Sequence, residues 1–170
     1  MDSKTVETYS QKASEFSQEW LEQPAPTDIY ELIEKYFIKD GKTIDVGCGN
    51  GRDTNWLNQN NFPAIGVDAV ESLLAEGFRL FPDVEFKKAN LPKLDEIKEK
   101  FSNVFCETVI MHLPISEVAE SVQRIKSLAV KGGVIYLSWR VTEKDEILHF
   151  EDKISKSSGK RVCRLIAKVK

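Results

Sequence analysis

A glycine-rich turn directly after a short β-branched segment constrains this chain more than any other feature. Residues 43–46 read Thr-Ile-Asp-Val, and glycines follow at alternate positions as Gly47, Gly49 and Gly51. Glycine adopts positive φ and lets a ligand lie directly against the backbone. The stretch therefore predicts a strand, a tight turn and a helix. Such a turn lies where open α/β sheets bind nucleotide-like ligands.

The chain after this turn alternates short apolar runs with helical patterns. We predict five strands, at residues 43–46, 64–67, 84–87, 104–106 and 134–139, with helices between most of them, including 52–60 and 116–130. Alternation at this spacing is typical of right-handed βαβ crossovers and of a parallel sheet covered on both faces. Residues 145–152 and 160–170 can add two antiparallel strands joined at 157–159, although the first of these segments can equally be a helix.

Two helices are predicted ahead of the glycine turn. Residues 3–22 carry one apolar stripe at helical spacing, and prolines at positions 24 and 26 end that helix. The second helix begins at Thr27 or Asp28, either of which is a good N-cap, and Glu31 stands in capping-box position relative to Asp28. We expect one domain over residues 1–170, with these helices in 1–40, a ligand-binding core in 41–140 and a C-terminal hairpin in 141–170.

The composition excludes several classes of protein. A chain of 170 residues can bury a real core without metals or disulfides. Its three cysteines form no CxxC pair, so we expect free thiols and no metal site. No apolar run approaches the roughly 20 residues of a membrane span, and the polar N-terminus shows no signal peptide. We therefore expect a cytoplasmic protein with no membrane partner.

Charge is distributed unevenly along the chain. Residues 153–170 contain seven basic and no acidic residues, which gives +7 and leaves −10 for the remainder of a chain with net charge −3. A basic segment can bind nucleic acid. Lysines also commonly protect the edges of sheets, and we favour the solvated face of an edge strand over nucleic-acid binding.

Carboxylates near the glycine turn indicate which ligand it holds. Asp68 ends the next predicted strand, 17 positions after Gly51, where a carboxylate can accept both hydroxyl hydrogens of a ribose. Asp45 precedes the glycines and can face an ammonium group. Arg52 and Asp53 stand where a dinucleotide fingerprint has its later glycine, and no Lys-Ser/Thr pair follows the turn. Nicotinamide, flavin and P-loop phosphate sites are thereby disfavoured.

With these motifs the chain resembles the class I S-adenosylmethionine-dependent methyltransferases, in the branch that acts on small molecules. The resemblance covers residues 9–140 and implies an α/β, Rossmann-like, doubly wound and mostly parallel seven-stranded sheet with a shortened C-terminal region. The matching segments are 43–51, 65–68, 88–92, 105–113 and 132–137, together with Tyr9, Ala13 and Phe16 of the N-terminal helix that closes over the cofactor in this branch.

The resemblance implies that the cofactor is S-adenosylmethionine and the product S-adenosylhomocysteine. The glycines would pass under its methionyl part, Asp68 would hold the ribose hydroxyls, and Asn90, where the family usually has Asp, would accept from the adenine amino group. The residues that we expect to bind the cofactor are Tyr9, Asp45, Gly47, Cys48, Gly49, Asn50, Arg52, Asp68, Ala69, Asn90, Leu91 and Cys106.

Acceptor residues are less determined by the motifs. His112 and Glu107 are candidate general bases, since both follow the fourth strand where the acceptor should lie. A backbone-bonded histidine and a solvent-facing carboxylate are the structural alternatives. Arg140 can bind an acceptor carboxylate or form a surface salt bridge. Phe16 and Trp20 are further candidates for acceptor contacts.

The reaction implied is in-line transfer of the methyl group to a small-molecule acceptor, by a monomer or homodimer. Most of its rate can come from orienting the two reactants. Two alternatives stay open: a module that binds S-adenosylmethionine without catalysis, and a methyltransferase that acts on RNA or protein.

Overall fold

The computed structural model describes residues 3–141, 152–154, 158 and 160–170. The strands are β1 (Thr43–Val46), β2 (Ala64–Asp68), β3 (Glu85–Lys88), β4 (Phe101–Cys106), β5 (Ala129–Arg140), β6 (Asp152–Ile154) and β7 (Arg161–Lys168). The helices are α1 (Ser3–Gln11), α2 (Ala13–Glu22), α3 (Thr27–Tyr36), α4 (Arg52–Gln59), α5 (Glu71–Leu80) and α6 (Ile115–Leu128), with a short 3₁₀ helix, η1, at Ile110–His112.

The described strands form one seven-stranded sheet in the order β3-β2-β1-β4-β5-β7-β6. The strands β1 to β5 run parallel to one another, and β7 runs antiparallel to both β5 and β6. The strand order reverses direction beside β1, between β2 and β4. This is the doubly wound α/β fold that the sequence predicted, and the glycine turn lies at its switch point.

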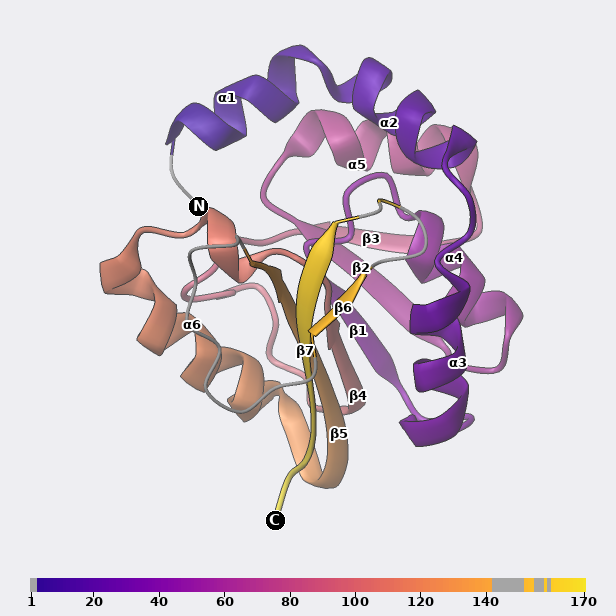
Figure 1. Ribbon diagram of the computed structural model, residues 1–170, viewed down its shortest axis with the longest axis vertical. Helices are drawn as coiled ribbons and strands as arrows, with labels where there is room; N and C mark the ends of the chain where they lie inside the picture. Colours follow the sequence, from indigo (N-terminus) through magenta and orange to yellow (C-terminus); the bar gives the residue numbers. More distant parts are fainter. Residues whose placement is uncertain (1–2, 142–151, 155–157, 159) are drawn as a thin grey trace.

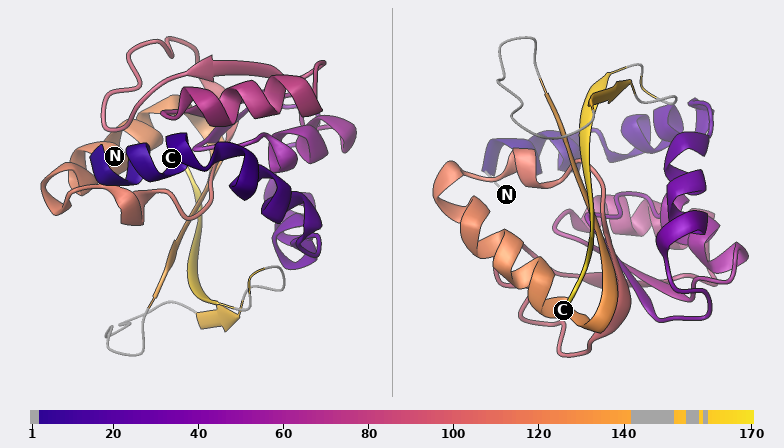
Figure 2. Two further views of the ribbon diagram at one scale, coloured as in Figure 1. Left: turned by 90° about the horizontal axis from the view of Figure 1, so that it is seen from above. Right: turned by 60° about the horizontal axis from the view of Figure 1, so that its bottom comes forward.

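Helices cover both faces of the sheet (Figures 1 and 2). On one face, α3 and α4 enclose a cluster around Phe62, Phe105 and Tyr136. On the other face, α6 and the segment that leads from β3 to β4 enclose a second cluster around Val104 and Ile135. The α1 and α2 helices lie across the end of the sheet at which the parallel strands stop (Figure 1). That end therefore lies beneath a helical cover.

Two strands are longer than the sequence predicted. β4 begins at Phe101, and β5 begins at Ala129 rather than after the glycines at 132 and 133. Gly132, at a φ of +81°, lies within β5, where the pairing with β4 shifts register. The glycines therefore mark a bulge inside a strand and not the turn before it.

The start of α3 corrects the expected capping box. The N-cap position is Pro26, with no side-chain hydrogen bond to the helix end, and Asp28 lies inside the first turn. The Asp28 carboxylate instead pairs with Arg164 of β7, at 2.6 Å. The Asp28 side chain thus forms a long-range ion pair and does not cap its own helix.

The basic C-terminal segment forms a sheet edge over only part of its length. β7 lies between β5 and β6, but among the described residues β6 pairs only with residues 161–163, so residues 164–168 have no strand on that side. Only 5% of the Arg164 side chain is exposed. Charge pattern alone could not show that a further short strand would cover this edge. Residues 145–151, whose strand or helix character the sequence left open, lie outside the described residues, and residue 152 begins β6.

Among the described residues, no helix combines the length and apolar character that a membrane span requires.

Candidate cofactor and acceptor site

A pocket opens at the carboxyl ends of β1, β2, β4 and β5, beneath α1 and α2. Eleven of the site residues expected from the sequence line it. They are Tyr9, Trp20, Asp45, Gly47, Cys48, Gly49, Arg52, Asp68, Glu107, His112 and Arg140. The carboxyl ends of parallel strands meet at one edge of a sheet, which is why residues so distant in the chain converge here.

The glycine turn needs glycine for two separate reasons. Gly47, Gly49 and Gly51 all have positive φ, at +79°, +57° and +79°. A Cβ on Gly47 would also lie 2.2 Å from Cγ2 of Val109, and one on Gly49 would lie 2.7 Å from the ring of Trp20. The turn is therefore packed closely on one side while its backbone faces the pocket on the other.

Asp68 is held rigidly at the end of β2. Its Oδ2 accepts the Gly49 N–H at 2.9 Å, and its Oδ1 accepts the Val70 N–H at 2.8 Å. Burial raises the pKa of this carboxyl, and these backbone hydrogen bonds oppose the rise. Each oxygen keeps a lone pair for a further donor. A ligand that presents two adjacent hydroxyl groups would satisfy both.

A smaller hollow continues from Asp68 along the far side of the turn. It shares Gly47, Asp68 and Val109 with the main pocket and is also lined by Ala69 and Leu91. Asn90 lies outside both hollows. Its side chain is exposed and borders a separate surface groove, which Leu91 also lines.

Asp45 is buried at the floor of the pocket. Its exposed fraction is 3%, and its Oδ2 accepts a hydrogen bond from the Thr54 hydroxyl at 2.6 Å. Burial raises the pKa of Asp45 to about 8, since a carboxylate loses its hydration there. A ligand ammonium group beside Asp45 would favour the ionised form.

We expect Asp45 to make the stability of the chain depend on pH. Between pH 3.8 and about 8 the folded chain keeps a proton on Asp45 that the unfolded chain releases, so stability falls as pH rises through that window. Relative to Asp45→Asn, the wild type should lose about 1.4 kcal/mol of unfolding free energy per pH unit there. Urea unfolding of both proteins across the window measures this loss. Parallel pH curves for the two proteins would contradict it.

The α2 helix is fastened to the glycine turn. The Asn50 amide donates to the Ser17 carbonyl and hydroxyl oxygens at 3.1 and 2.9 Å, and Arg52 donates to the Trp20 carbonyl at 2.9 Å. Asn50 is thus buried against α2 and does not line the pocket. A displacement of the turn would therefore also displace α2.

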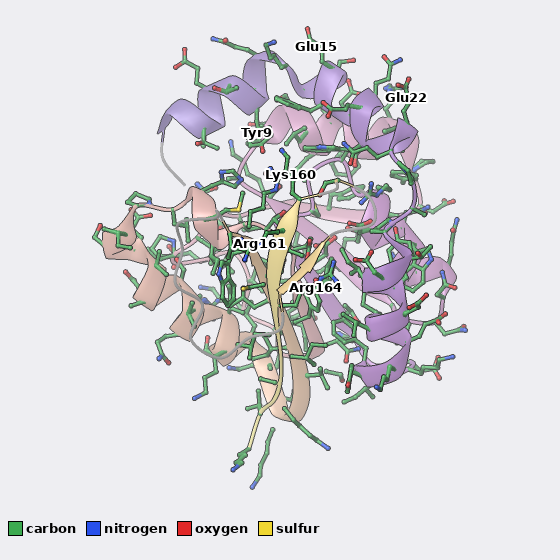
Figure 3. All side chains as sticks on the ribbon, in the orientation of Figure 1. Tyr9, Glu15, Glu22, Lys160, Arg161 and Arg164 are labelled. Carbon is green, nitrogen blue, oxygen red and sulfur yellow. The ribbon has the colours of Figure 1, made fainter. Side chains whose placement is uncertain are left out.

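Aromatic rings form the underside of that cover. Tyr9 lies on the inner side of α1 (Figure 3), and its ring centroid is 6.1 Å from that of His112, in an edge-on contact. Phe16 packs between Tyr9 and Trp20, at 4.9 and 5.9 Å from their centroids. Phe16 therefore supports the two pocket-lining rings without lining the pocket itself.

Glu107 stands in the pocket wall at the end of β4. The Tyr136 and Ser138 hydroxyls both donate to its Oε2, at 2.6 and 2.5 Å. Cys106, the preceding residue, is fully buried in the cluster on the opposite face of the sheet and does not line the pocket. The alternation of side chains along a strand explains why neighbours in sequence reach different environments.

Sequence reasoning missed several residues of this site. Tyr136 and Ser138 belong to a strand that reads as ordinary core, and Val109 and Thr108 follow Glu107 in a turn without a distinctive pattern. Period-two alternation along β5 would have put Tyr136, Ser138 and Arg140 on one face. Their convergence on a carboxylate from β4 needed the pairing register of the two strands.

In the described part of the chain, no cluster of three or more His, Cys, Asp or Glu side chains is arranged to hold a metal ion. Cys48, Cys106 and Cys163 are buried, and none of the three forms a disulfide.

Comparison with known proteins identifies the family. A family described as "Methyltransferase domain" matches residues 44–133, which is more than half of the chain. The chain therefore belongs to this methyltransferase domain family, and the resemblance to class I S-adenosylmethionine-dependent methyltransferases is confirmed.

Individual relatives are more distant. A putative methyltransferase of Geobacillus sp. (strain WCH70) is 28% identical over 144 residues, covering 79% of this chain and 56% of the relative. The 2-heptyl-1-hydroxyquinolin-4(1H)-one methyltransferase of Mycobacteroides abscessus is 28% identical over 120 residues, covering 68% of this chain and 52% of the relative. The chain spans about half the length of the curated relatives that it matches.

A solved structure described as the "DhpI-SAM-HEP complex" matches with a TM-score of 0.64 at 18% identity, over 97% of this chain and 80% of that one. At this identity the match supports the fold alone.

Proposed function

We propose that this chain binds S-adenosylmethionine in the pocket beneath α1 and α2 and transfers its methyl group to a small-molecule acceptor. One observation carries the proposal. Gly47, Gly49 and the fixed carboxylate of Asp68 face one pocket, which Glu107, His112 and Arg140 also line. Cofactor and acceptor groups thus share a single enclosed space.

The residues present fit this cofactor. Glycine lets the turn pack against Val109 and Trp20 while its backbone faces the pocket, and Asp68 has acceptor capacity left for two ribose hydroxyls. Asp45 supplies a buried carboxylate for the methionyl ammonium, and the adenine would lie toward Ala69 and Leu91, which border the small hollow next to Asp68. When bound, the cofactor supplies a methyl group on a positively charged sulfur, ready for displacement by a nucleophile.

The acceptor side of the pocket favours a small molecule with a polar end. Ile29, Phe105 and Val162 give it apolar walls, whereas Glu107 and Arg140 supply charge. The described residues give Arg140 no side-chain hydrogen bond or ion pair, so its guanidinium is available to an acceptor carboxylate. The quinolone acceptor in the name of one relative is consistent with an enclosed, partly apolar site.

A module that binds the cofactor without catalysis is the second candidate. Such a module would keep the glycine turn, Asp45 and Asp68 and would bind S-adenosylmethionine, but it would transfer no methyl group to any acceptor.

Calorimetric titration with S-adenosylmethionine and S-adenosylhomocysteine tests the cofactor, with ATP as the control ligand. We expect both sulfur compounds to bind and ATP to fail, since the turn has no phosphate-binding lysine. If neither sulfur compound binds at high micromolar concentration, the proposal is wrong. Radiolabelled methyl transfer is then measured with pools of small molecules, RNA and protein. The pool that becomes labelled distinguishes a small-molecule methyltransferase from one that acts on RNA or protein.

A further inference from the structure

The Glu107 carboxylate is oriented by more contacts than a pocket-lining side chain needs. Its Oε2 receives hydrogen bonds from Tyr136 and Ser138, and the Ser138 oxygen in turn accepts the Thr108 N–H at 2.9 Å. Thr108 has a φ of +54°, which is uncommon for a β-branched residue and is retained only where the surroundings impose it. The strained turn and the hydroxyl pair together fix Glu107 in the pocket wall.

A buried cation lies on the same face of the sheet. Arg164 of β7 (Figure 3) stands directly across from Ser138 in the β5–β7 pairing. Only 5% of its side chain is exposed, and its Nη2 donates to Oδ2 of Asp28 at 2.6 Å. Its Nε and Nη1 have no hydrogen-bond partner among the described residues. Burying a guanidinium in this way costs desolvation free energy unless nearby negative or polar groups compensate its charge.

The other charges around Glu107 do not replace this cation. Asp53 lines the same pocket and disfavours a negative charge on Glu107, while Arg52 is paired with Asp53 at 2.9 Å. His112 and Arg140 line the pocket from η1 and the end of β5. Burial raises the pKa of Glu107, and the Ser138 and Tyr136 hydrogen bonds and the Arg164 charge lower it. Arg164 is the cation whose charge lowers the pKa of Glu107, and it lies across from the Ser138 that donates to Glu107.

We propose that Arg164, anchored by Asp28, is a positioning residue that lets the buried Glu107 carboxylate ionise and serve as the base for the acceptor. The catalytic role of Glu107 rests on the proposed function. Glu107 accepts the proton of an acceptor hydroxyl or amino group as that atom bonds to the methyl carbon. The carbon–sulfur bond breaks with its electron pair left on sulfur, and Glu107 ends protonated. The acceptor atom is therefore an oxygen or nitrogen that carries a hydrogen.

The experiment is a ¹³C NMR titration of the full chain labelled at the glutamate carboxyl carbons, with Glu107→Gln used to assign the Glu107 signal. Arg164→Gln should raise the Glu107 midpoint by about one pH unit or more, because an opposite charge that lowers the pKa of Glu107 has been removed. Arg164→Lys, which keeps the charge, should restore most of the shift. Arg161→Gln, on the same strand, should leave the midpoint where it is.

An unchanged midpoint in Arg164→Gln, or an equal rise in Arg161→Gln, overturns the proposal. If Arg164→Gln does not fold, the double change Asp28→Asn with Arg164→Gln removes both charges and leaves no buried carboxylate without its partner. The titration needs neither cofactor nor acceptor. A failure here therefore differs from a failure of S-adenosylhomocysteine to bind, which would remove the proposed function instead.

Discussion

Asp68→Ala should weaken the binding of S-adenosylhomocysteine by at least about 100-fold, since hydrogen bonds from two hydroxyl groups to a charged acceptor, each worth roughly 1.5–3 kcal/mol, together contribute about 3 kcal/mol or more. The same change removes the oxygens that accept the Gly49 and Val70 N–H groups. The turn should therefore lose some of its order even without ligand. Calorimetric titration of the variant and the wild type measures the loss.

The control for this change is Glu71→Ala, three residues further along. Glu71 pairs with Lys88 on the surface at 2.8 Å, with its side chain 78% exposed, so the variant removes a carboxylate near the pocket without entering it. Its affinity should match that of the wild type. Equal affinities for all three proteins would mean that Asp68 is not where the ribose binds.

Gly47→Ala should destabilise the chain by about 3 kcal/mol and abolish cofactor binding. Positive φ costs an L-residue about 1–2 kcal/mol, and overpacking adds typically 1–3 kcal/mol. The overpacking arises because the new Cβ would meet Val109 at 2.2 Å. Urea unfolding measures the stability, and calorimetry with S-adenosylhomocysteine measures the binding.

Gly132→Ala is the matched control for the backbone part of this effect. Gly132 has a φ of +81°, close to that of Gly47, but no atom lies within 4 Å of the Cβ that alanine would add. Gly132→Ala should lower the free energy of unfolding only by the cost of the backbone conformation, about 1–2 kcal/mol, and leave the binding site intact. The difference between the two variants isolates the contact with Val109. Equal losses of stability would show that Val109 moves aside freely.

The parallel part of the fold was predictable because its signals are local. Most strands from β1 to β5 contain a short apolar run bounded by a helix or a turn, and neighbouring strands follow from right-handed crossovers. The larger errors concern contacts between distant segments. Asp28 was expected to cap its own helix but pairs with Arg164, and β7 was expected at an edge that β6 partly covers.

The candidate site was predictable to the same extent. Asp45, the glycines and Asp68 are tied to the ends of strands, so a correct sheet brings them to one pocket. The predicted roles of individual residues remain predictions. The sequence could not show that Asn90 lies outside the pocket or that Tyr136 bonds to Glu107, because both depend on how side chains from separate crossovers meet.

The antiparallel strand β7 completes the pocket from a segment late in the chain. β5 pairs with residues 162–168, and Val162 of the same strand forms part of the pocket wall. The glycine turn and all five parallel strands precede that wall in the chain. A chain truncated after residue 140 would therefore keep the residues proposed to bind the cofactor but lack Val162 of the pocket wall, so the acceptor side of the pocket is complete only once β7 has paired with β5.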